Sequence, residues 1–158
     1  MEQVKPTDAT SPRPLRPELA VLFASDGSEH ALKAARFLAG MLSEGQAEVR
    51  LLVALSMGLD PSYVGKLSDA GARHARVEQE TEKAVGEARQ IFEAAGQATS
   101  TCCRFGHPPD ETLREIAVSK PDLVVVGRRG LGRTASLVLG SVSGSLVRHS
   151  KVPIMVVP

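Results

Sequence analysis

Aromatic side chains are scarce in this chain, whose 158 residues include no Trp, one Tyr and four Phe. The core must then be built from Val, Leu, Ile and Ala, and an aromatic platform on which nucleic-acid bases stack is not expected. No stretch approaches the apolar length of a transmembrane helix, and the first residues lack the apolar segment of a signal peptide. We therefore expect a cytoplasmic protein with neither a membrane nor a nucleic-acid partner.

Cysteine is nearly absent, and the only two, Cys102 and Cys103, are adjacent. Neighbouring side chains on a strand point to opposite faces, so these two thiols are poor partners for a disulfide or for a shared metal ion. We interpret one or both as small buried residues of the core. Reduced thiols agree with a cytoplasmic location.

Acidic residues are missing from the last part of the chain. All eighteen precede Leu123, whereas five of the nineteen basic residues follow it, although the net charge is only +1. These five are Arg128, Arg129, Arg133, Arg148 and Lys151. A solvated surface alone could produce this asymmetry, but a site for a polyanion predicts it.

Strand and helix patterns alternate along most of the chain. Apolar runs typical of buried strands occur at 19–24, 49–55, 99–104, 123–126 and 154–157, and helical patterns lie between them at about 28–44, 69–95, 109–120 and 141–150. This alternation predicts a single-domain α/β fold with an open, parallel five-stranded sheet and helices on both faces. Winding outward from the first strand would give the Rossmann-like strand order 3-2-1-4-5.

Two stretches are expected to lie outside this regular structure. Residues 1–17 contain four prolines among polar and charged residues and are predicted to form a disordered tail. Residues 56–68 are predicted to form a long loop after the second strand. His107, in the Gly106-His107-Pro108 turn, is interpreted as structural rather than catalytic, because a partner acid or cysteine nearby in sequence is not expected for it.

A ligand in such a sheet binds at the carboxyl ends of the strands where the strand order reverses, here between the first and fourth strands. The first strand ends in Ala24-Ser25-Asp26, and the fourth ends in Val126-Gly127. Gly127-Arg128-Arg129-Gly130 is followed, nine residues later, by Gly140-Ser141-Val142-Ser143 at the start of a helix. Glycines let backbone N–H groups approach a ligand and a helix start is partly positive, so this stretch predicts a phosphate site.

The two common phosphate-binding motifs are absent. No segment matches the P-loop G-x-x-x-x-G-K-[ST], and Asp26-Gly27-Ser28 stands where the dinucleotide motif would follow the first strand. These absences disfavour a P-loop ATPase and an NAD-dependent dehydrogenase.

The pattern Gly127-x-x-Gly130-x9-Gly140-Ser141 resembles the ATP-binding signature of the universal stress protein family. The likeness covers about residues 18–158, which are identified as a universal stress protein domain. Four further landmarks occur in the right order: Ser25-Asp26-Gly27-Ser28, Gly106-His107-Pro108, Pro121-Asp122-Leu123, and Val152-Pro153-Ile154-Met155-Val156-Val157.

The resemblance implies a nucleotide-binding fold, ATP with Mg²⁺ bound through the phosphates, and a homodimer that pairs its final strands. By this likeness Ala24, Ser25 and Asp26 line the adenine and ribose side, Ala54 lies against the base, and Val126 and Gly127 lie under the ribose and α-phosphate. The phosphates are held by backbone N–H groups and hydroxyls of Gly130, Gly140, Ser141, Val142 and Ser143.

Two features depart from the family pattern. The position after Gly127 is usually Ser or Thr in the family but is Arg128 here, followed by Arg129, and Ala54 replaces a commonly larger apolar residue. Either at least one of Arg128, Arg129 and Arg133 pairs with a phosphate, or these guanidinium groups point to solvent. Arg129 is retained among the candidate ligand-binding residues.

Three functions remain open from the sequence. The leading hypothesis is an ATP-dependent switch in the stress response. A second is slow ATP hydrolysis or self-phosphorylation on Ser141 or Ser143, for which Asp26 is the sole general-base candidate. The third is a dimeric structural module that does not use ATP, paired through the apolar strand 154–157.

Overall fold

The computed structural model describes residues 18–56, 70–130 and 139–158, and the side chains of 70–74 are not described. The predicted disordered tail at 1–17, nearly all of the predicted loop at 56–68, and Arg133 lie outside these ranges. None of the helices within them is both long and apolar enough to cross a membrane.

The sheet has five parallel strands in the order β3-β2-β1-β4-β5, so the predicted fold class and strand order are confirmed. The strands are β1 (Leu19–Ala24), β2 (Ala47–Leu55), β3 (Ala98–Phe105), β4 (Leu123–Gly127) and β5 (Ile154–Val157). β2 begins two residues before its predicted start at Val49, because Ala47 is buried while Glu48 and Arg50 alternate outward, and a strand buried on one face need not be continuously apolar.

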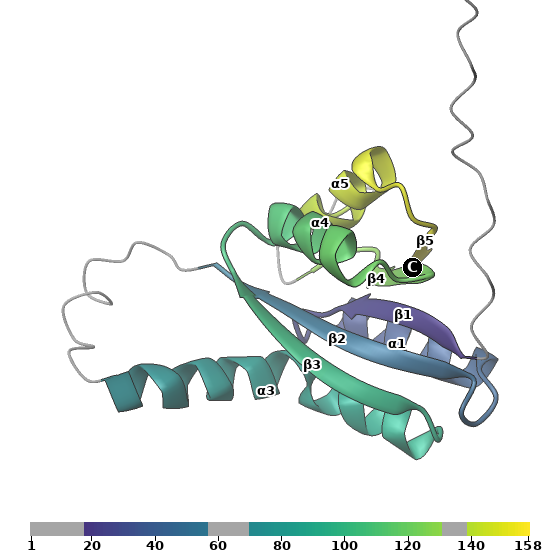
Figure 1. Cartoon of the computed structure of the whole chain (residues 1–158), viewed down its shortest axis with the longest axis horizontal. Helices are drawn as coiled ribbons and strands as arrows, with labels where there is room; N and C mark the ends of the chain where they lie inside the picture. The colour runs from purple at the N-terminus through teal and green to yellow at the C-terminus, as the bar shows by residue number, and fades with distance from the viewer. Residues whose placement is uncertain (1–17, 57–69, 131–138) are drawn as a thin grey trace, which may run out of the picture.

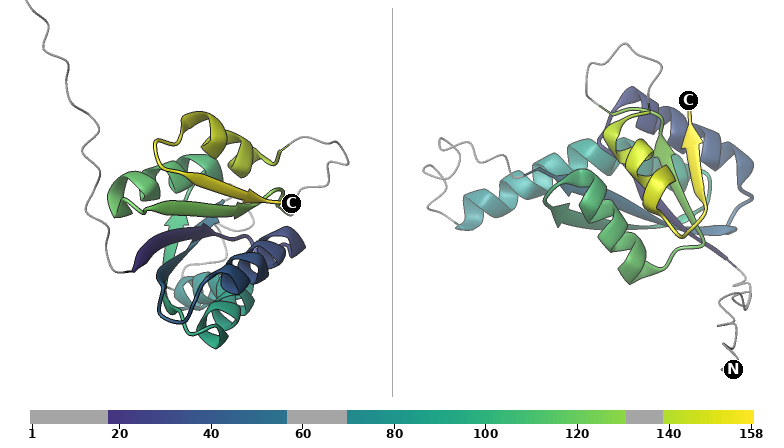
Figure 2. Two further views of the ribbon diagram at one scale, coloured as in Figure 1. Left: turned by 90° about the vertical axis from the view of Figure 1, so that its right-hand side faces the viewer. Right: turned by 90° about the horizontal axis from the view of Figure 1, so that it is seen from above.

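The helices lie on both faces of the sheet. They are α1 (Glu29–Met41), α3 (Ala70–Ala94), α4 (Pro108–Ser119) and α5 (Ser141–His149). Figure 1 shows α1 and α3 below the sheet and α4 and α5 above it, and the two views of Figure 2 agree. Each βαβ connection is therefore a crossover of the kind that parallel strands require.

Two apolar cores hold these layers together. The first packs Val21, Phe23, Leu51 and their neighbours against α1 and α3, where the rings of Phe23 and Phe92 meet edge to face at 5.2 Å. The second packs Leu22, Leu52 and Val126 against Ile116 of α4 and Leu146 of α5. Burial of these aliphatic side chains supplies most of the drive to fold.

The adjacent cysteines border different cores. Cys102 packs against the second core and Cys103 against the first, on opposite faces of β3, as the alternation of side chains along a strand predicts. Both thiols are free and half-buried rather than fully buried.

Candidate functional site

A crevice of about 390 Å³ opens at the carboxyl ends of β1 and β4. The structure brings all twelve site residues proposed from the sequence to its lining: Ala24, Ser25, Asp26, Ala54, Val126, Gly127, Arg129, Gly130, Gly140, Ser141, Val142 and Ser143. Four lining residues were not proposed: Ala31, Leu52, Pro108 and Thr112. These residues therefore lie together in one crevice. Their roles toward a ligand stay predictions.

The loop after β1 is fastened to α3. The Ser25 hydroxyl donates to the carbonyl of Ala84 at 2.6 Å and accepts from the N–H of Gly27 at 3.2 Å. Gly27 has a φ of +75°, and a Cβ there would lie 2.8 Å from the carbonyl oxygen of Lys83. Only glycine fits this turn without strain. The Ser25 hydroxyl is therefore engaged within the protein, and Asp26 is the exposed polar residue of this loop.

The segments on either side of 131–138 meet at one backbone carbonyl. The carbonyl of Arg128 accepts from the N–H of Gly140 at 2.9 Å and from the Ser143 hydroxyl at 2.8 Å. The N–H of Arg128 in turn donates to Val157 of β5 at 2.7 Å. These bonds fix the start of α5 beside the end of β4.

The N-terminus of α5 faces the crevice without a side-chain cap or an acidic residue in its first turn. Its N-cap residue is Gly140, which makes no side-chain capping bond, and its first turn carries no acid. The Ser143 hydroxyl is buried and donates to Arg128, whereas Ser141 is exposed. The first N–H groups of a helix lack intrahelical acceptors and carry partial positive charge, so this end suits an anion.

The remainder of the crevice combines an apolar floor with two charged side chains. Leu52, Ala54 and Val126 supply apolar surface from β2 and β4. Asp26 and Arg129 are the charged residues of the described lining, and Asp26 also accepts from the N–H of Ser28 at 3.0 Å. Such a site suits a ligand with one flat apolar part and one anionic part.

No group of three or more His, Cys, Asp or Glu side chains in the described parts of the chain could hold a metal ion. Arg128, considered as a phosphate ligand from the sequence, is not among the lining residues, whereas Arg129 is. Asp26 is the carboxylate of the described lining.

α4 also contributes to the crevice, which the sequence did not predict. Pro108 and Thr112 line the crevice, and the Thr112 hydroxyl donates to the carbonyl of Pro108 at 2.7 Å. Pro108 follows the turn after β3, and this turn lies at the same sheet edge as the other strand ends. Its position in the sequence could therefore have predicted that it lines the crevice. The expectation that His107 lacks an acidic neighbour was wrong, because its Nδ1 lies 3.1 Å from Oδ2 of Asp110 on the exposed surface.

The comparisons with known proteins agree on one family. The sequence model of the universal stress protein family matches residues 20–158. A universal stress protein of Thermus aquaticus is 35% identical over 138 residues, which are 87% of this chain and 96% of that protein.

Two solved structures share the fold. One, a hypothetical protein solved as a test case of structural genomics, is 20% identical with a TM-score of 0.73, and the match covers 90% of this chain and 96% of that one. The other is a universal stress protein in complex with cAMP, 25% identical with a TM-score of 0.61, and the match covers 90% and 98%.

Proposed function

This chain belongs to the universal stress protein family, and we propose that its crevice binds ATP and that the bound nucleotide switches the protein between states in the stress response. The observation that carries this proposal is the N-terminus of α5, which lacks a side-chain cap and opens onto a crevice with an apolar floor. A structural neighbour of this family binds cAMP, which supports a nucleotide as the ligand class.

The donor groups of the crevice fit this ligand. Leu52 and Ala54 would lie against the adenine ring, and Val126 and Gly127 under the ribose. The phosphates would meet the backbone N–H groups of Gly130 and of 140–143, with the Arg129 guanidinium as a second source of positive charge. Mg²⁺ would arrive on the phosphates, because the described residues form no metal cluster.

Self-phosphorylation is the second candidate, and the structure separates its two acceptors. The Ser143 hydroxyl is buried and engaged by Arg128, whereas Ser141 is exposed at the crevice. We therefore assign any phosphoryl acceptor role to Ser141. Positioning without a dedicated base would make this reaction slow. We place these activities in the cytoplasm, in accord with two free thiols.

Replacing Gly130 with valine is expected to weaken ATP binding about 10- to 100-fold, because the branched side chain would stand beside the Gly130 N–H and keep a phosphate from reaching it. One hydrogen bond to a charged group contributes about 1.5–3 kcal/mol, and 1.4 kcal/mol is a factor of ten. A Cβ at Gly130 would meet only the flexible carboxylate of Asp26, so the fold should tolerate it. Calorimetric titration with ATP and a thermal unfolding curve measure both effects. Mass spectrometry of nucleotide released from the denatured wild-type protein gives an independent check. Undiminished ATP affinity in the variant would remove Gly130 from the site.

We further propose a homodimer that pairs β5 with its copy. β5 pairs only with β4 among the described strands, so its outer edge is open. α1 packs against β4 and β5, and its apolar side chains Phe37 and Met41 leave 52% and 58% of their surfaces exposed. An open edge with apolar side chains beside it favours association.

A Phe37→Lys/Met41→Lys variant is expected to weaken this dimer by about tenfold or more, because central apolar residues of an interface cost over 1 kcal/mol when lost. Light scattering after size exclusion measures the mass. Val118→Lys is the matched control, because Val118 is equally apolar and 68% exposed but lies on α4. A double variant that keeps the mass of a dimer would contradict the assignment of this surface.

A further inference from the structure

A buried carboxylate lies between α4 and the sheet. Glu115 of α4 is completely buried, and its carboxylate meets two guanidinium groups that reach in from the sheet. Arg50 of β2 forms an ion pair with Oε1 at 2.8 Å between Nε and oxygen, although not with hydrogen-bond geometry. Arg104 of β3 donates to Oε2 from Nε at 2.8 Å and also from Nη2.

This ion cluster occupies a position where aliphatic packing would be expected. Ile116, the next residue of α4, packs into the second apolar core with Leu52 and Leu146. Glu115 instead faces the two strands at the β3 edge of the sheet. Its hydrogen bonds and charge raise the pKa of Arg104 above the ordinary value for arginine. A buried carboxylate is costly unless it is paired, so the docking of this side of α4 depends on both cations.

The cluster lies beside the crevice along both α4 and β3. Thr112, which lines the crevice and is 1% exposed, lies one helical turn before Glu115 on the same face of α4. On the sheet side, Arg104 is the register partner of Ala54, which forms part of the crevice floor. A shift of α4 relative to β2 and β3 would therefore move Pro108 and Thr112 relative to that floor.

We propose that Glu115 is a positioning residue for the crevice. Its ion pairs with Arg50 and Arg104 hold α4 against β2 and β3 and so set the width of the crevice between the α4 residues and Ala54. Glu115 touches no ligand in this role and acts through Pro108 and Thr112. The effect on ligand affinity rests on the proposed nucleotide site, whereas the effect on the position of α4 does not.

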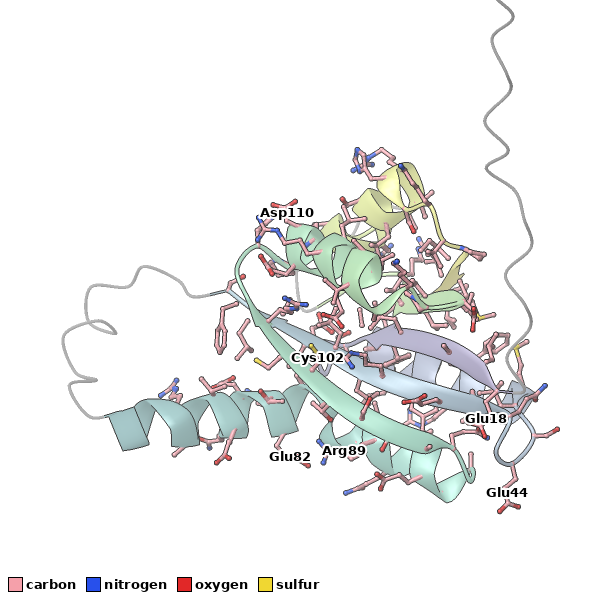
Figure 3. The ribbon with its side chains drawn as sticks, viewed as in Figure 1. Glu18, Glu44, Glu82, Arg89, Cys102 and Asp110 are labelled. Carbon is pink, nitrogen blue, oxygen red and sulfur yellow. The ribbon has the colours of Figure 1, made fainter. Side chains whose placement is uncertain are left out.

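The protein carries its own reporter for the position of α4. Cys102 lies on the face of β3 that α4 covers, two residues before Arg104, and Figure 3 labels it on this strand. It is half-buried against the core that contains Ile116, while Cys103 lies on the opposite face. Loosening of α4 should therefore expose Cys102 and leave Cys103 unchanged.

The experiment compares Glu115→Gln with Glu115→Asp. Gln is close in shape to Glu and removes the charge, leaving two guanidinium groups facing each other, whereas Asp keeps the charge on a shorter side chain. The matched control is Arg36→Gln, which removes the Arg36–Glu87 ion pair, 2.9 Å long, between α1 and α3 on the other face of the sheet. For each protein, the rate of modification by a disulfide reagent is followed at each cysteine by mass spectrometry, and ATP affinity is measured by calorimetry.

We expect Glu115→Gln to speed modification of Cys102 by about 2- to 30-fold and to weaken ATP binding by a similar factor. This is the range over which mutations of residues that link two sites change the coupling between them. Glu115→Asp should give intermediate values, and Arg36→Gln should match the wild type in both. Wild-type values for Cys102 and ATP in the Gln variant would overturn the proposal. If the Gln variant does not fold, wild-type values in the Asp variant would overturn it instead.

The two proposals fail in different ways. A wild-type protein that binds no ATP would refute the nucleotide site. Faster modification of Cys102 in both Glu115→Gln and Glu115→Asp would still support the positioning of α4, because Asp keeps the negative charge beside Arg104, with which Cys102 also interacts. Normal ATP binding with an unchanged Cys102 rate in every variant would leave the nucleotide site intact and refute the role of Glu115.

Discussion

A Ser141→Glu variant is expected to bind ATP about 5- to 1000-fold more weakly than the wild type while remaining at least as stable. Ser141 is exposed, lines the crevice and is the first residue of α5. The new carboxylate would stand where the phosphates are proposed to lie. Two like charges 4 Å apart repel by about 1 kcal/mol in water and about 4 kcal/mol near a protein surface, and each 1.4 kcal/mol is a factor of ten.

Stability should change in the opposite direction in this variant. An acid in the first turn of a helix interacts favourably with the partial positive charge there, which contributes about 0.3–1 kcal/mol, and the first turn of α5 has no acid of its own. The variant should therefore unfold at the same temperature as the wild type or slightly above it. A merely disruptive substitution would lower both stability and affinity.

Ser141→Gln is the matched control, because glutamine has nearly the shape of glutamate without its charge. We expect it to retain most of the affinity, and calorimetry with ATP and with AMP compares the three proteins. The loss caused by glutamate should be larger for ATP than for AMP, since ATP carries more phosphate charge. Equal affinity in all three proteins would place the phosphates elsewhere.

A Gly127→Ala variant is expected to lose about 2–3 kcal/mol of unfolding free energy, the upper part of the range for overpacking a close contact. A Cβ at Gly127 would lie 2.7 Å from the carbonyl carbon of His30, 2.8 Å from its oxygen and 2.9 Å from the N–H nitrogen of Ala31. All three are backbone atoms, so no side-chain rotation relieves the contact. Either β4 or the first turn of α1 must move.

Gly40→Ala is the control, and its expected change in unfolding free energy has the opposite sign. A Cβ at Gly40 would have nothing within 4 Å, and Gly40 is an exposed residue inside α1. Alanine is the better helix former by about 0.5–1 kcal/mol, so this variant should be slightly stabilised. Urea unfolding of both variants measures the difference. A Gly127→Ala protein as stable as the wild type would show that α1 does not rest on β4 as closely as described.

Gly127 also changes how the glycine motif is understood. From the sequence, Gly127 is expected to let the backbone approach a phosphate. In the folded chain, the same glycine lets β4 approach the start of α1, while Gly130 and Gly140 are the motif glycines that lie toward Asp26 and the start of α5. A motif can therefore combine residues that serve the ligand with residues that serve the packing.

The sequence alone determined the layers, the strand order and the edge at which the crevice lies. Apolar runs with helical patterns between them are local features, and right-handed crossovers leave few ways to assemble them. The carboxyl ends of parallel strands then converge at one edge, so Ser25, Asp26 and Gly127 could be placed together before any contact was known. The element boundaries agree to within a few residues, because caps and glycines also act locally.

Only the tertiary structure decided which groups remain available in the crevice. The hydroxyls of Ser25 and Ser143 looked equivalent to that of Ser141, but their acceptors, Ala84 and Arg128, lie 59 and 15 residues away along the chain. Glu115 has no pattern that separates it from a solvated helix acid, and its burial follows from two arginines that reach it from β2 and β3. Hydrogen bonds and ion pairs between distant segments depend on how closely the elements approach each other. The hydrophobic periodicity of the sequence does not indicate that distance.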